Sequence, residues 1–100
     1  MFISNIGDYD IYPMTKIQGN YIKIQVSKDI LTSEIREVPK KGYSLVLFSF
    51  SGKQLLITTG EKDIKNLSIN LKEIEEGKYI LRIENNKDKT LIQSYCVEKL

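Results

Sequence analysis

The sequence contains no histidine and no tryptophan, and only one cysteine among its 100 residues. Without an imidazole, the chain has no serine triad, no cysteine-histidine pair and none of the usual zinc sites, because each of these uses histidine as base or ligand. A single thiol, that of Cys96, excludes a disulfide within the chain, so stability must come from packing. These absences predict a protein that is not an enzyme and that holds no cofactor or metal.

Excess charge and long apolar runs are also scarce. Fifteen Lys and Arg against thirteen Asp and Glu give a net charge of +2, which is too small and too scattered to indicate nucleic-acid binding. No stretch approaches the length of a membrane span, and residues 1–12 lack the basic start and apolar run of a signal peptide. We therefore expect either a cytoplasmic protein or a secreted or cell-surface domain whose export signal lies upstream.

What is present is an ordinary globular composition, with 41% apolar and 28% charged residues. A chain of this length is expected to fold as one domain with its own core, spanning residues 1–100. Cys96 is best explained as a small apolar residue in or beside that core.

The clearest strand follows a glycine bend at Gly77. After it, Tyr79, Leu81 and Ile83 alternate with polar residues, which places them on the buried face of a strand. A tyrosine two residues after a glycine at the start of a late strand is typical of the tyrosine corner in immunoglobulin-like sandwiches. We therefore expect the Tyr79 ring inside and its hydroxyl bonded to backbone just before Gly77.

The rest of the chain alternates between short apolar runs and turn residues. Gly52 is expected to close a tight hairpin after Ser51, because glycine supplies the positive φ that such turns need. Further strands are predicted at residues 21–26, 30–38, 43–50, 53–59 and 90–97, with a short edge strand at 9–12. Among them, 30–38 is expected at a sheet edge and 43–50 at the centre.

Residues 63–76 fit two patterns. The apolar residues fall on one helical stripe at Ile64, Leu67, Leu71 and Ile74. The same run also alternates as a strand through Leu67, Ile69 and Leu71. Because turns and strands flank the segment, we favour a strand at 67–71 followed by a single helical turn at 72–76, with the helix as the alternative.

Seven or eight short strands without a long helix predict an all-β protein, an immunoglobulin-like antiparallel β-sandwich. An open-ended barrel of the same strands is the rival architecture. The predicted core consists of Ile22, Ile24, Val26, Leu45, Leu47, Leu55, Ile69, Leu71, Tyr79, Leu81 and Ile83.

From Leu45 onward the order of motifs resembles the C-terminal sorting domain of proteins exported by the bacterial type IX secretion system. That family carries a hairpin with Gly-Lys, an alternating strand, a Gly-x-Tyr strand and a final strand ending in lysine. The matching residues are Gly52, Lys53, Gly77, Tyr79 and Lys99. Ser49 stands where the family usually has aspartate, and Met14-Thr15 follows Tyr12-Pro13 where the family opens with Tyr-Pro-Asn-Pro.

The resemblance implies a non-enzymatic sorting and surface-attachment module whose partner is a protein of the secretion machinery. Recognition is then expected at the exposed last strand, with Glu98, Lys99 and Leu100, and at the hairpin loops beside it. The chain also resembles small free-standing immunoglobulin-like secreted proteins, which implies adhesion or ligand binding through exposed tyrosine rings. The candidate rings are Tyr9, Tyr12 and Tyr95.

Overall fold

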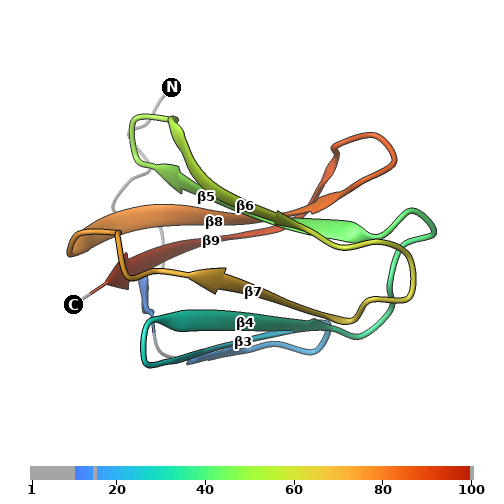
Figure 1. Ribbon diagram of the computed structural model, residues 1–100, viewed down its shortest axis with the longest axis horizontal. Coiled ribbons are helices and arrows are strands. Elements are labelled where there is room, and N and C mark those ends of the chain that lie inside the picture. Colours follow the sequence, from blue (N-terminus) through green and yellow to red (C-terminus); the bar gives the residue numbers. More distant parts are fainter. Residues whose placement is uncertain (1–10, 15, 100) are drawn as a thin grey trace.

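The computed structural model describes residues 11–14 and 16–99, which form nine strands and no helix. The strands are β1 (Ile11–Pro13), β2 (Lys16–Gln18), β3 (Ile22–Ser27), β4 (Ile30–Ile35), β5 (Tyr43–Ser49), β6 (Gln54–Thr59), β7 (Asn66–Asn70), β8 (Gly77–Asn85) and β9 (Leu91–Lys99). They build a five-stranded sheet in the order β1-β9-β8-β5-β6 and a four-stranded sheet in the order β2-β3-β4-β7. The sheets lie one above the other (Figure 1). The predicted all-β sandwich is confirmed.

The centre of the core lies where β5 pairs with β8. Leu45 is opposite Ile83 and Leu47 is opposite Leu81, and all four side chains are fully buried. Burial of a side chain of this size stabilises the fold by roughly 1.5 to 3 kcal/mol. As predicted, β5 lies inside its sheet, between β8 and β6.

β4 is not the edge strand that the sequence suggested, because it pairs with β3 on one side and β7 on the other. The alternation of apolar and polar residues along β4 is weak because Ser33 occupies a core position between Leu31 and Ile35. Ser33 is itself buried. The Ser33 hydroxyl lies 2.8 Å from the hydroxyl of Tyr43, and Tyr43 donates a 2.7 Å hydrogen bond to the carbonyl of Lys65. Because of these hydrogen bonds, the Ser33 hydroxyl is buried in the core without being left unpaired.

Most of the predicted core is confirmed, but Leu55 lies outside it. The pairing of β5 with β6 shifts after Leu47, so that Leu47 is opposite Leu56 while Phe48 is opposite Gln54. Leu55 is therefore the extra residue of a bulge, and Leu56 packs against the core instead. Val26 and Tyr79 are half-buried and pack on the rim of the core.

The ambiguous segment 63–76 contains strand β7 and no helix. Leu67 and Ile69 are buried in the core from β7, which confirms the favoured strand. The expected helical turn is a tight turn instead, closed by a 3.0 Å hydrogen bond from the amide of Ile74 to the carbonyl of Leu71. Leu71 itself is buried, which anchors the start of this turn.

The strand predicted at 9–12 corresponds to β1, although residues 9 and 10 lie outside the described part of the chain. β1 runs parallel to β9, with Ile11 opposite Cys96 and Pro13 opposite Glu98. β9 therefore has a neighbour on each side over this stretch. The last strand was expected to be exposed; at Cys96 to Glu98 its edge is covered by β1.

Candidate recognition surface

The residues that carry the family resemblance gather at one end of the sandwich. The turn between β5 and β6 holds Gly52 and Lys53, β8 begins at Gly77, and Gly77 is opposite Lys99 at the end of β9. Figure 1 shows this end on the left, beside the C-terminus. We call it the motif end, and define it as residues 50–53, residues 72–77 and Lys99.

The β5–β6 turn is held by its own hydrogen bonds. Gly52 has a φ of +94°, and its amide donates to the carbonyl of Ser49 over 3.0 Å. The Ser49 hydroxyl accepts a 3.1 Å hydrogen bond from the amide of Lys53. Ser49 therefore supplies an oxygen acceptor at the position where the family usually has aspartate. The side chain of Lys53 is exposed, and Phe50 is 46% exposed beside it.

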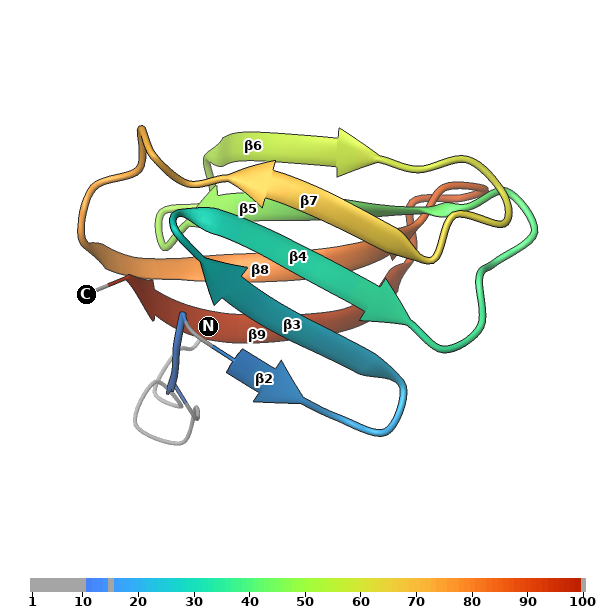
Figure 2. The same ribbon diagram turned by 60° about the horizontal axis from the view of Figure 1, so that its bottom comes forward.

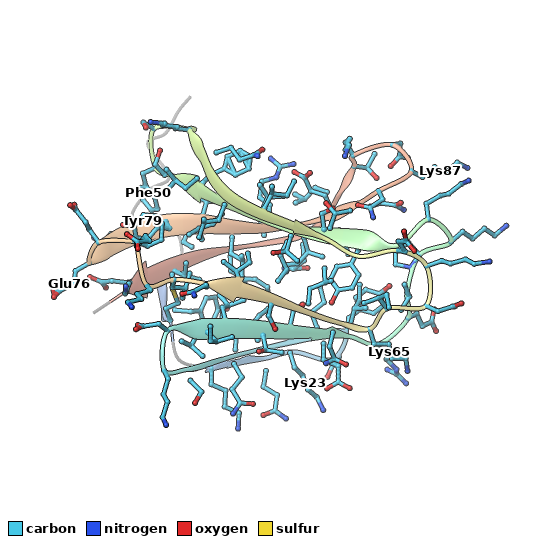
Figure 3. The ribbon with its side chains drawn as sticks, in the orientation of Figure 1. Lys23, Phe50, Lys65, Glu76, Tyr79 and Lys87 are labelled. Atoms are coloured by element: carbon cyan, nitrogen blue, oxygen red, sulfur yellow. The ribbon has the colours of Figure 1, made fainter. Side chains whose placement is uncertain are left out.

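Tyr79 fixes the loop that precedes β8. Its hydroxyl donates a 2.6 Å hydrogen bond to the carbonyl of Glu75, two residues before Gly77, and its ring packs against the core. Gly77, with a φ of +149°, makes the bend between them. The tyrosine-corner bond is present as predicted, and Figure 3 shows Tyr79 at the motif end, near Phe50.

Two substitutions of Tyr79 are expected to destabilise the fold to different extents. Tyr79→Phe removes one hydrogen bond and should lower the free energy of unfolding by about 1 kcal/mol. Tyr79→Ala also removes the packed ring and should cost roughly 3 kcal/mol or more. Denaturant melts measure both, with Tyr21→Phe as control, because Tyr21 makes a similar bond to Glu37 but is 40% exposed. An unchanged midpoint for Tyr79→Ala would show that the corner contributes nothing.

Lys99 is bonded to the same loop. Its ammonium donates hydrogen bonds of 2.8 Å to the carbonyl of Leu71 and 2.6 Å to that of Ile74. Glu98 is half-buried, and its carbonyl accepts a 2.8 Å bond from the amide of Met14. Leu100 lies outside the described residues. The terminal lysine therefore has a structural role in this fold, and its role in recognition stays a prediction.

A comparison with family profiles finds one that covers nearly the whole described fold. Residues 11–98 match the profile described as the secretion system C-terminal sorting domain, so the match includes β1, both sheets and nearly all of β9. The chain belongs to the secretion system C-terminal sorting domain family. A search among curated proteins found no match.

The tyrosines expected as a contact surface of this sorting domain are instead part of its packing. Tyr12 and Tyr95 form an edge-to-face pair with ring centroids 5.7 Å apart, and both rings pack against the core. Burial raises the pKa of Tyr95 above its ordinary value. These two rings are half-buried and not fully exposed, because β1 brings Tyr12 onto β9. Tyr9 lies outside the described residues.

Cys96 lies half-buried on β9, opposite Ile80 of β8. Burial raises the pKa of its thiol, and a protonated thiol is a poor nucleophile. Within residues 11–14 and 16–99, no three acidic or cysteine side chains form a cluster that suits a metal ion. The same part of the chain has no helix that is long and apolar enough to span a membrane.

At the end of the sorting domain opposite the motif end, the side chain of Asn86 in the β8–β9 turn bonds several neighbouring segments. The Asn86 side-chain amide donates to the carbonyls of Lys41 at 3.2 Å and Gly60 at 2.7 Å, and its oxygen accepts a bond from the Ser44 hydroxyl. The Asn86 side chain thus connects its own β8–β9 loop with the β4–β5 and β6–β7 loops. The sequence shows an Asn-Asn pair before a lysine. Nothing in that pattern distinguishes an asparagine that bonds other loops from one in a solvated turn.

Proposed function

We propose that this domain is a non-enzymatic export module of the type IX secretion system. It directs a polypeptide attached ahead of it to the cell surface or the medium, and its partner is a protein of the secretion machinery. The observation that carries the proposal is the family match over residues 11–98, together with the placement of the motif residues at one end of the fold.

We further propose that the partner contacts the exposed loops of the motif end. Binding residues are often found on loops that a rigid scaffold holds in place. Here Ser49 holds the turn that presents Phe50 and Lys53, while Tyr79 and Lys99 hold the neighbouring loop. Strand addition at the end of β9 is disfavoured, because β1 already pairs with this edge.

Export of a fused reporter tests the proposal. In a host with this secretion system, a reporter followed by residues 1–100 should reach the surface, as measured by its accessibility to added protease. A double variant of the turn, Phe50→Ser with Lys53→Glu, should remain folded and strand the reporter in the periplasm. The matched control, Leu91→Ser with Lys89→Glu, also replaces one apolar and one basic side chain, at exposed positions of the opposite end, and should be exported normally.

Two results would contradict the proposal. A reporter that stays inside with the intact domain would rule out the sorting role. Normal export of the turn variant would keep the sorting role and remove the motif end as its contact surface.

Lys99→Met is expected to act through stability. Two charge-assisted hydrogen bonds are lost, and the free energy of unfolding should fall by about 1 to 2 kcal/mol. At a temperature where the variant remains folded, the fused reporter should still be exported. Lys78→Met, at an exposed position of β8, is the control and should unfold like the parent. If folded Lys99→Met is not exported, the secretion machinery reads Lys99 directly.

A further inference from the structure

The outer face of the four-stranded sheet carries polar side chains in an ordered array. The cross-strand register aligns one row from β2 to β7 as Gln18, Lys23, Glu34 and Asn66. It aligns a second row as Lys16, Gln25, Thr32 and Ser68. Figure 2 shows this sheet turned toward the viewer. The two rows combine amides, hydroxyls and lysines and contain no apolar side chain.

This face is also where the positive charge of the domain gathers. Arg36 and Lys65 lie beside the first row, since the amide of Arg36 bonds the carbonyl of Tyr21 and the amide of Ile35 bonds that of Lys65. A groove of about 280 Å³ is lined by Lys23, Arg36 and Lys65 together with Glu34. Together with Lys16, which lines a second groove, the groove-lining residues include four cations and one carboxylate, a balance of +3. Figure 3 shows Lys23 and Lys65 on this side.

These cations are not engaged by carboxylates of the described residues. The one ion pair in that part of the chain joins Arg82 to Glu84 over 3.0 Å, on the outer face of the other sheet. Arg82 also lies over the ring of Phe48, 5.8 Å from its centroid. The five-stranded sheet thus neutralises its arginine internally, while Lys23, Arg36 and Lys65 remain available to an anionic ligand.

We propose that the outer face of the four-stranded sheet binds an acidic polysaccharide. Amide and hydroxyl side chains offer both donors and acceptors, which match the hydroxyl groups of sugars, and the cations match their acidic substituents. A second groove, of about 290 Å³, shares Lys23 and Glu34 with the first, so the two suit an extended chain. An acidic polypeptide is less favoured, because protein interfaces rely on several apolar and aromatic anchors, and among the residues that line the two grooves Tyr21 is the one exposed aromatic or apolar side chain. The proposal is independent of the sorting role.

Binding of polygalacturonate to the intact domain, measured by titration calorimetry at low salt, tests this proposal. The triple variant Lys23→Gln, Arg36→Gln, Lys65→Gln should bind about tenfold more weakly, because it removes the local positive potential. The control Lys40→Gln, Lys41→Gln, Lys62→Gln makes the same change in charge around a different cleft. It should bind within about twofold of the parent. Equal losses in the two triples would overturn the proposal, because binding would then follow net charge alone.

A second variant separates sugar recognition from simple charge attraction. Gln18→Ala with Gln25→Ala leaves every charge in place and should still weaken polygalacturonate binding several-fold. Neutral dextran, poly-glutamate and DNA serve as comparison ligands. If poly-glutamate or DNA binds as tightly as polygalacturonate, or if the amide variant binds like the parent, the face is not a polysaccharide site.

Discussion

Replacing Gly42 by alanine is expected to destabilise this domain strongly. A Cβ atom at this position would lie 2.1 Å from the carbonyl oxygen of Gly60 and 2.7 Å from the carbonyl carbon of Glu61. Neither contact is with a flexible side chain, so the backbone of the β6–β7 loop would have to move. The residue also has a φ of +83°. The clash and the left-handed backbone together should lower the free energy of unfolding by about 4 kcal/mol or more.

Gly52→Ala is the matched control for that change. Gly52 has a similar φ of +94°, but nothing lies within 4 Å of an added Cβ. It should therefore show only the backbone cost, about 1 to 2 kcal/mol. Denaturant melts of the two variants separate the cost of the steric clash from the cost of the left-handed backbone. Equal losses in the two would mean that the close approach between Gly42 and Gly60 is not a constraint on this fold.

Asn86→Ala is expected to lower the free energy of unfolding by about 3 kcal/mol, because three polar groups each lose a hydrogen bond worth about 1 kcal/mol. The affected groups are the carbonyls of Lys41 and Gly60 and the hydroxyl of Ser44. Ser44 is buried, so water does not replace the lost bond, and its hydroxyl keeps only the Thr59 hydroxyl, 3.0 Å away, as a partner. Thermal or denaturant unfolding gives the size of the loss.

Asn85→Ala controls for the loss of an amide in the same loop. The Asn85 side chain accepts one local hydrogen bond, 3.0 Å from the amide of Lys87. Its removal should cost less than about 1 kcal/mol. If Asn85→Ala and Asn86→Ala destabilise the domain equally, Asn86 is an ordinary turn residue and not a clamp.

The parts of this fold that the sequence predicted are those set by local patterns. Alternation of apolar residues located the strands, and the spacing of Gly77 and Tyr79 predicted a hydrogen bond that the structure contains. The edge position of β4 was predicted wrongly because Ser33 breaks its apolar face. That serine is buried only because Tyr43, ten residues away, reaches its hydroxyl. A strand pattern alone carries no information about such a partner.

The candidate site was harder to predict than the fold for a similar reason. The resemblance indicated which residues matter, and the structure shows that they share one end. It did not indicate that Lys99 bonds the carbonyls of Leu71 and Ile74, since this contact spans more than twenty residues. The sequence likewise did not predict the group of cations on the outer face of the four-stranded sheet. Lys23, Arg36 and Lys65 come from different parts of the chain, and only the pairing of strands brings them together.

The parallel pairing of β1 with β9 determines how the domain bears mechanical tension. A polypeptide attached ahead of Ile11 pulls β1 lengthwise against β9, whose own end points the opposite way along the pull. The hydrogen bonds between these two strands, including that from Met14 to Glu98, are then loaded together in shear and do not open one by one.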